Sequence, residues 1–297
     1  MSSTFTAIDL SQIPAPDIIE PLDYEAVYAE MLAKLREFIP DFDDSLESDP
    51  AVRVLQVAAY FRLLDRQRVN DAGRAAMLAY AKGNDLDNLG ALVGVARLTL
   101  TPADEENGTP AVMEDDEDFR RRITLAPEGY SVAGPRGAYI FYALSAASDV
   151  ADASAISPAP TEVEVYVLSR TGTGAASPEL LATVEAALSG EDVRPIGDQV
   201  TIHSASIVNY AIVASLPTFA GPDKDVVLAE AQARIDSWVA ANRKLGRNIN
   251  RAAICAALFP GGVENVLLTS PAADIPIDDT QAGNCTGITL TWGGVAA

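Results

Sequence analysis

A short turn with two glycines, Arg170–Gly174, is the part of this sequence whose composition could bind a phosphate group. It follows a predicted strand and precedes a predicted helix, as the glycine-rich loop of a dinucleotide-binding fold does. That loop needs a further glycine three residues later, where Ser177 stands, and the sequence has no Gly-Lys-Ser or Gly-Lys-Thr for a P-loop. We interpret the segment as a surface turn. A nucleotide-binding α+β enzyme that uses residues 171–177 stays open as the alternative function.

Side chains for nucleophilic or metal chemistry are scarce. His203 is the single histidine, so any Ser-His-Asp or Cys-His arrangement would depend on it. The sequence lacks a Gly-x-Ser-x-Gly elbow, and Cys255 lies in an alanine-rich, apolar segment. Together with Cys285 it makes two cysteines, too few for a disulfide framework, and no cluster has zinc-ligand spacing. The sequence predicts a protein that is not an enzyme and has no catalytic residue, cofactor or metal site.

Five consecutive carboxylates run from Glu114 to Asp118. They lack the alternating spacing and the turn glycine of an EF-hand loop, so they do not predict a calcium site. Three arginines, Arg120–Arg122, follow them, and this order of charges suits the dipole of a helix. We expect a helix whose acidic start is solvated.

A long helix dominates the N-terminal region. Asp49 is a favourable N-cap, and Pro50 fits the first helical position. Gly83 supplies the left-handed residue that ends helices, so we expect about 33 residues, or roughly 50 Å. A second helix, Asp85–Gly94, follows at once, and a helix that begins after Asp23 should form an antiparallel hairpin with the long one.

The long helix carries two apolar stripes and is basic, in contrast to the rest of the chain. The first stripe consists of Val52, Leu55, Ala59 and Leu63, and the second of Val57, Phe61 and Leu64. Two stripes separated by arginines imply two packing partners. We predict that partner chains contact the apolar and basic residues of this region, namely Val52, Leu55, Ala59, Leu63, Arg62, Arg66, Arg68, Arg74, Leu86, Leu89 and Leu92.

Composition excludes several classes of protein. The formal net charge of −21 and pI of about 4.3 argue against binding to nucleic acid, because phosphates would be repelled. A hydrophobic content of 48% is ample for packed cores. No segment approaches the ~20 apolar residues of a membrane span, so we expect no direct membrane contact. The N-terminus does not have the pattern of a secretion signal, and synthesis in the cytoplasm is expected.

The chain is longer than the ~150 residues of one domain. We predict an α+β fold in which an N-terminal arm and helical bundle are followed by two small α+β domains in tandem and a C-terminal arm. The helices predicted after the linker are the one with the acidic start, one that begins at Pro135 and continues through Leu144, and those at 178–188, 223–241 and 250–259. The predicted strands are 163–168, 199–203, 207–216, 263–269 and 288–292. The predicted boundaries are 1–98 for the arm and bundle, 99–113 for a flexible or extended linker, 114–204 and 205–272 for the α+β domains, and 273–297 for the arm. That last arm contains so few apolar residues that we expect it to be donated to a partner.

Several segments, taken in order along nearly the whole chain, resemble the baseplate J-like family of contractile-tailed phages. They are residues 8–17, Arg66–Asn70, Tyr80–Asp87, Asp118–Ile123, Pro127–Pro135, and the turn Arg194-Pro195 with Leu245–Arg247. Each short motif is weak by itself, but the conserved order makes the resemblance specific.

The resemblance implies a structural wedge subunit of the baseplate, located in the virion and assembled in the host bacterial cytoplasm. It further implies that two copies join one copy of a second wedge protein, and that a sheath-initiating protein docks on their helical bundle. Six such units would form the inner ring around the central hub and spike, with neighbouring copies in contact, and would rearrange on contraction. The family also occurs in bacteriocin-type particles, and the resemblance fits either kind of particle.

Overall fold

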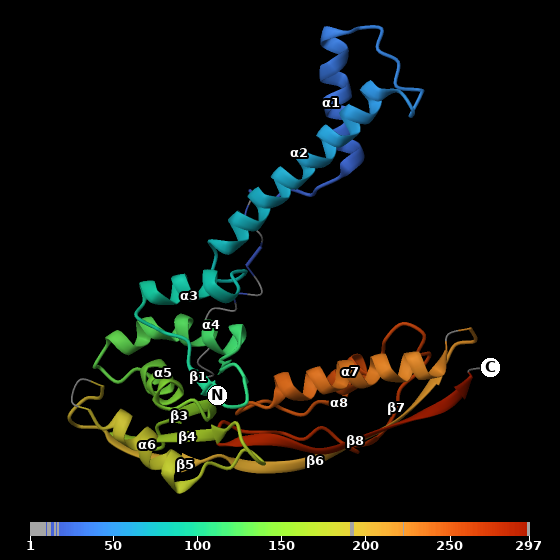
Figure 1. Cartoon of the computed structure of the whole chain (residues 1–297). Coiled ribbons are helices and arrows are strands. Elements are labelled where there is room, and N and C mark those ends of the chain that lie inside the picture. Colours follow the sequence, from blue (N-terminus) through green and yellow to red (C-terminus); the bar gives the residue numbers. More distant parts are fainter. Residues whose placement is uncertain are drawn as a thin grey trace. The chain divides into compact units, whose positions relative to one another are not determined.

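The computed structural model describes residues 10, 13–14, 16, 18–190, 193–221 and 223–295 (Figure 1). The chain divides into two compact units. The helical unit comprises Thr6–Arg97 together with Asp115–Arg121, and the sheet unit contains Leu98–Glu114 and the chain from Arg122 onward. The mixture of helices and small sheets confirms the predicted α+β class. The predicted domain boundaries stay predictions.

The helical unit contains α1 (Tyr24–Phe38), α2 (Pro50–Ala75) and α3 (Gly83–Leu92). Two of these helices begin where the capping residues predict. The Asp23 carboxylate accepts a hydrogen bond from the Glu25 N–H, and that of Asp49 accepts one from the Ala51 N–H. Helix α1 folds back along α2, so the two form the expected hairpin.

Helix α2 is shorter than predicted, because it has 26 residues and ends at Ala75. The turn after it leaves backbone carbonyls without helical partners, and Arg120 takes two of them. Its Nε donates to the Leu78 carbonyl and its Nη2 to the Ala81 carbonyl, each at 2.7 Å. Gly83 has a positive φ of 51° as expected, but it begins α3 and does not end α2.

The boundaries of α3 also differ partly from the prediction. Its N-cap is Lys82 and not Asp85, and the Asp116 carboxylate accepts the Gly83 N–H. Gly94, with φ of 72°, follows the last turn as predicted.

The predicted flexible or extended linker is a β-hairpin in the structure. Strand β1 (Thr99–Thr101) pairs antiparallel with β2 (Val112–Met113), and Asp104 and Thr109 exchange two backbone hydrogen bonds. The Asp104 carboxylate accepts hydrogen bonds from the Asn107 side-chain amide and from the backbone of Asn107 and Glu106, and these bonds lower its pKa. Asp104, in the segment that was predicted to be a flexible or extended linker, therefore stabilises the turn.

The first half of the sheet unit has its own hydrophobic core. It contains α4 (Asp116–Leu125, whose first turns belong to the helical unit), the 3₁₀ turn η2 (Ala126–Tyr130), α5 (Arg136–Ala146) and α6 (Pro178–Leu188). The strands β3 (Val150–Ile156), β4 (Glu162–Ser169) and β5 (Gln199–Ser204) form a sheet in that order, with β4 and β5 parallel. Strand β3 was not predicted. Buried residues such as Tyr139, Val165 and Val184 join α5, β4 and α6 in one core.

The second half contains a longer sheet in the order β7-β6-β8, formed by β6 (Ser206–Thr218), β7 (Leu267–Ser270) and β8 (Gln281–Val295). Figure 1 shows α7 (Lys224–Asn242) lying along one face of this sheet, and α8 (Arg251–Ala257) packs against α7. Ile212, Ile235 and Ile254 are fully buried in the core between the sheet and these helices. Among the described residues, no helix is both long and apolar enough to cross a membrane.

The expectation of a donated C-terminal arm was wrong for residues 281–295. Strand β8 pairs in parallel with β6 along its whole length, from Gln281 opposite Ser206 to Val295 opposite Thr218. Its apolar side chains alternate with threonines, and Ile288 and Leu290 pack on the core below α7. Low apolar content therefore reflects a strand with one buried face.

Candidate partner-binding surface

Helix α2 buries its first apolar stripe against its own chain. Val52, Leu55 and Ala59 are buried, and α1 contributes the buried Val27 and Leu32 to the same hairpin. The chain thus supplies one of the two packing partners that the stripes implied.

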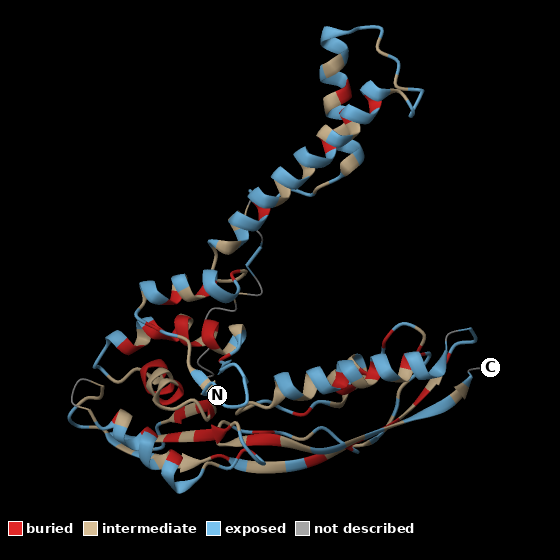
Figure 2. Ribbon diagram, in the orientation of Figure 1, coloured by how far each residue is buried: buried red, intermediate tan, exposed pale blue. Residues whose placement is uncertain are grey.

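The opposite face of α2 carries large apolar side chains in water. Val54, Val57, Phe61 and Leu64 are 69%, 55%, 59% and 44% exposed, and we call these four residues the outer stripe. Phe61 follows Val52 by nine residues, about 2.5 helical turns, so the outer stripe lies on the side of α2 opposite the buried one. In Figure 2 the exposed colour covers most of this helix.

The spacing within the outer stripe is that of a coiled-coil seam. Its members follow one another after three, four and three residues, as the a and d positions of a heptad do. Tyr60 lies beside the stripe, 52% exposed, with its ring edge-on to that of Phe61 at 5.8 Å. The second predicted stripe did not include Val54 or Tyr60. Val54 could have been found from the sequence, because the a/d spacing of the stripe begins with it.

The structure separates the eleven predicted interface residues into three groups. Val52, Leu55, Ala59 and Leu86 are buried within this chain, so their side chains cannot be the first contacts of a partner. Leu63 and Leu89 are half-buried. Leu92 is 82% exposed, and Arg62, Arg68 and Arg74 are exposed as well.

The arginines of α2 do not share one role. Arg66 lies between two carboxylates of its own chain, with Nη2 2.9 Å from Glu30 and Nε 3.7 Å from Glu20. Arg74 has an exposed ion pair with Asp71, at 3.4 Å, of the kind that contributes little stability. Arg62 and Arg68 are both exposed, but only Arg68, seven residues after Phe61, lies on the side of the outer stripe, where it can meet an acidic partner.

A pair of hydrogen bonds from the Asn70 side chain, which we call the clamp, holds the N-terminal segment on α2. The Asn70 amide donates to the Glu20 carbonyl at 2.8 Å, and its oxygen accepts the Glu20 N–H at 3.2 Å. Asn70 is 2% exposed. Three residues later a Cβ on Gly73 would lie 3.0 Å from Ile18, so the segment passes close to the helix there. The described part of this proline-rich segment therefore lies along α2.

Two arginines, the half-buried Arg97 and the buried Arg120, join the helices that follow α2, and the sequence had assigned Arg120 only to a helix dipole. The Arg97 guanidinium lies 2.8 Å from both Asp87 and Asp116 and 4.6 Å from the centre of the Phe119 ring. Together with the Arg120 contacts described above, these bonds fix α3 and the start of α4 to the turn after α2. The helical unit therefore presents α2 from a rigid base.

The expectation that Glu114 is solvated was wrong. Its side chain is 1% exposed and accepts two hydrogen bonds from Arg122, at 2.9 Å from Nε and 2.7 Å from Nη2. It also accepts the Leu98 N–H, at 3.1 Å, so this carboxylate ties the β1–β2 hairpin to α4. Buried bidentate pairing of this kind orients two elements.

The glycine turn that could have bound a phosphate is bonded to its own chain. Arg243 donates to the carbonyls of Arg170 and Gly172, at 3.3 and 2.8 Å. The Ser177 hydroxyl accepts the Leu180 N–H at the start of α6, and a Cβ on Gly174 would lie 2.7 Å from Leu168. The turn is packed on protein, and its helix start is already capped.

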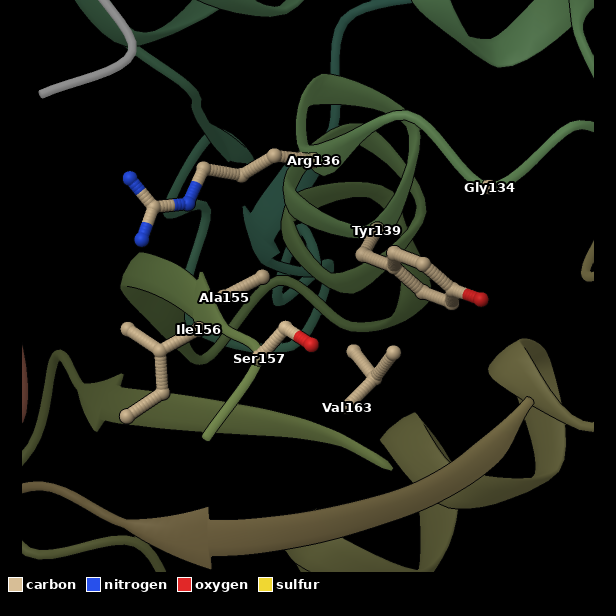
Figure 3. A pocket seen from close by; sticks show the side chains of 7 residues that line it. All are labelled: Gly134, Arg136, Tyr139, Ala155, Ile156, Ser157 and Val163. Carbon is tan, nitrogen blue, oxygen red and sulfur yellow. The ribbon is translucent and has the colours of Figure 1, made fainter. Parts of the chain in front are cut away.

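A small cavity opens between α5 and the β3–β4 connection. Its volume is about 90 Å³, well below the ~300 Å³ of small ligand sites. Its polar groups do not converge, since Figure 3 shows the Arg136 guanidinium and the Tyr139 hydroxyl pointing in different directions. Burial and the nearby Asp198 raise the pKa of Tyr139, whose hydroxyl donates to that carboxylate at 2.6 Å. Within the described ranges, no group of three His, Cys, Asp or Glu side chains could hold a metal ion.

Comparison with known proteins identifies the family. Residues 47–104 match the Baseplate J-like N-terminal domain, 131–204 the Baseplate J-like central domain, and 210–291 the Baseplate J-like protein C-terminal domain. The chain is 48% identical over 296 residues to Baseplate protein J of Escherichia phage P2, a match that covers 97% of this chain and 98% of the relative.

A solved assembly is similar to a lower degree. A chain of the six-fold symmetrised cryo-EM structure of the anti-feeding prophage (AFP) baseplate matches with 15% identity and a TM-score of 0.38. That match covers 62% of this chain and 43% of the other.

The predicted family is thus confirmed on both counts, by three domains in order and by a full-length relative. The chain belongs to the baseplate J-like family and is a structural subunit of the baseplate of a contractile phage tail, located in the virion.

Proposed function

We propose that this chain is a wedge subunit whose outer stripe on α2 packs against helices of partner subunits. The observation that carries the proposal is the pattern Val54, Val57, Phe61 and Leu64, which places four large apolar side chains in water at heptad spacing. An exposed seam of this kind gains stability only when another helix covers it.

The partners follow from the family. Two copies of this chain and one copy of a second wedge protein would form a helical bundle, to which a sheath-initiating protein docks. Six bundles would surround the central hub and spike, with neighbouring copies in contact, and would rearrange on contraction. No enzymatic step is part of this role.

Charge supports a particular kind of partner surface. Arg68 follows Phe61 by seven residues, so it is exposed on the side of the outer stripe, in a chain whose formal net charge is −21. A partner helix with acidic residues flanking its apolar seam would complement it and would fix register more than affinity. Arg66 is a weaker candidate for this contact because Glu20 and Glu30 already neutralise it.

The contacts of Arg97 and Arg120 suit a subunit that must transmit force. They hold α3 and the start of α4 to the turn after α2, so that force applied to α2 would pass to the helices at its base. The outer stripe, which relies on apolar contact between chains, is then the place where subunits separate or slide.

The proposal is tested by tail assembly in cells that supply a variant chain in place of the natural one. Val57→Glu and Phe61→Glu leave the buried face of α2 unchanged, so the chain folds, but they should abolish the formation of tails with a baseplate. Val69→Glu is the matched control, since Val69 is 52% exposed on the same helix but lies about 120° around it from Val57. Normal assembly with the Val57 and Phe61 variants would contradict the proposal.

A further inference from the structure

The hairpin formed by β1 and β2 receives almost no cover from its own chain. Every residue from Thr101 to Met113 is exposed, and we call residues 101–113 the arm. Its sheet has two strands, so among the described residues no third strand pairs with either edge. An isolated two-stranded hairpin is marginally stable in water and needs a further strand or a packed face. Within the described chain the arm has neither.

The arm is nevertheless fixed at both ends by hydrogen bonds. At its base the Glu114 N–H donates to the Leu98 carbonyl at 2.8 Å, and Arg122 holds the buried Glu114 carboxylate. At its tip Asp104 and Thr109 exchange two backbone hydrogen bonds of 2.9 Å. The arm is therefore an ordered element whose side chains are free to contact another molecule.

Two prolines stiffen the arm and limit how it can bind. Pro102 lies directly after β1 and Pro110 two residues before β2, on opposite sides of the turn. Proline fixes φ and has no N–H to donate, so the arm is poorly suited to extend a neighbouring sheet. The contact surface is then its side chains, among them Val112 and Met113, which are 51% and 44% exposed. Because a stiff element loses little conformational entropy on binding, the arm suits insertion into a partner.

The charges of the arm are all negative. Asp104, Glu105 and Glu106 lie at its tip, and the sequence from Leu98 to Phe119 contains no Lys, Arg or His. Asp104 serves the turn, whereas the carboxylates of Glu105 and Glu106 have no ion pair within the part of the chain that the structure describes. A second copy of a chain with a net charge of −21 would repel this tip, so the charge favours a different protein with a basic surface.

We propose that the arm inserts into a groove of another baseplate subunit, with an apolar wall against Val112 and Met113 and with Lys or Arg side chains at Glu105 and Glu106. Methionine adapts to an irregular apolar wall, and opposite charges at the tip would fix the orientation of the arm. The arm belongs to the sheet unit, so this contact goes beyond the one proposed for α2 and names a second surface for a partner.

Tail assembly with variant chains tests the charge at the tip. Glu105→Arg with Glu106→Arg should lower the yield of tails with a baseplate by about tenfold or more, because like charges would meet in the groove. Both side chains are exposed, so the purified variant should keep the midpoint of thermal unfolding of the wild type. Glu185→Arg with Glu264→Arg is the matched control, since it changes the net charge equally at two exposed positions of the sheet unit. A wild-type yield with arginines at the tip, or an equal loss in the control, would overturn the inference.

Photo-crosslinking identifies what the arm contacts. Benzoylphenylalanine replaces Ala111, which is exposed beside β2, and is activated in purified tails that contain the baseplate. Mass spectrometry should map the adduct to a different tail protein, at a segment that contains Lys or Arg. An adduct with a second copy of this chain, an adduct at an acidic segment, or the absence of any adduct would overturn the inference.

The two proposals fail separately. A crosslink from Ala111 to a basic partner, together with normal assembly of the Val57→Glu variant, would contradict the outer stripe and support the arm. Blocked assembly of the Val57→Glu variant, together with no crosslink from Ala111, would support the outer stripe and contradict the arm.

Discussion

The side-chain amide of Asn70 forms two hydrogen bonds with the backbone of Glu20, fifty residues earlier in the chain. It donates to the Glu20 carbonyl and accepts the Glu20 N–H, and thereby replaces a strand partner for that one residue. An extended segment cannot satisfy its own backbone groups, so a buried amide is the means by which α2 holds it. The contact fixes the N-terminal segment on the face of α2 that the outer stripe does not use.

Asn70→Ala should lower the free energy of unfolding by about 0.5–1.5 kcal/mol, because two partly buried hydrogen bonds to the Glu20 backbone are lost. Chemical denaturation measures the change, and hydrogen exchange should show the Glu20 amide losing its protection. Gln67→Ala is the control, since Gln67 bonds Asp71 at the exposed surface and its loss should cost less than about 0.5 kcal/mol. Equal effects of the two substitutions would mean that the clamp does not stabilise the fold.

Glu114→Ala should destabilise the sheet unit by about 3–5 kcal/mol, because Arg122 would keep a buried charge without this partner carboxylate. The exposed pair of Arg234 and Glu230, four residues apart on α7, provides the comparison. Glu230→Ala should cost no more than about 0.5 kcal/mol. Urea denaturation of both variants tests this difference, and a Glu114 variant as stable as the Glu230 variant would refute the structural role of the buried pair.

Tyr210→Phe should make the protein less sensitive to alkaline pH. Burial, with a smaller contribution from Cys285, raises the pKa of Tyr210 above its ordinary value of 10.0. The folded state therefore favours the neutral phenol, and the stability from this group is present below pH 10.0 and lost as the pH rises toward the folded-state pKa. Unfolding measured between about pH 9 and pH 11 should show a shallower loss of stability in the variant. An unchanged slope would contradict the assignment to Tyr210.

Val57→Glu should leave the free energy of unfolding within about 0.5 kcal/mol of the wild type, because Val57 is 55% exposed. Its affinity for the partner bundle should fall by about tenfold or more, since burying a valine contributes about 1.5–3 kcal/mol. Thermal denaturation and co-purification from cells that express the tail proteins measure the two quantities. Val69→Glu should change neither the free energy of unfolding nor the affinity for the partner bundle. If it weakens co-purification as much as Val57→Glu does, the partner does not bind through the outer stripe.

Local signals predicted most of the elements. Asp23 and Asp49 cap the helices that they were expected to cap, α6 occupies the predicted residues 178–188, and Gly94 follows the last turn of α3. Each of these signals acts within one turn of the chain, so a single sequence contains it in full. The apolar stripes of α2 were likewise visible, because they depend on spacing along one helix.

Long-range partners could not be predicted. The sequence did not reveal which stripe of α2 the chain would cover, because that depends on α1, and it did not reveal that Arg120 would take the carbonyls of Leu78 and Ala81 and end α2 early. Strand β8 was predicted as a short strand or arm because half of its side chains face water, and its stability comes from pairing with β6, about 75 residues away. Burial of Glu114 depends in the same way on Arg122 and on Leu98, which lies at the other end of the β1–β2 hairpin.

Oxidative footprinting of Tyr60 and Phe61 shows directly whether a partner subunit covers the outer stripe of α2. Both rings are more than half exposed in the isolated chain, at 52% and 59%, and both lie on or beside the outer stripe. Hydroxyl radicals should oxidise them readily in the free protein and several-fold more slowly in purified tails that contain the assembled baseplate. Equal oxidation of both rings in free protein and in tails would show that no partner covers this face of α2.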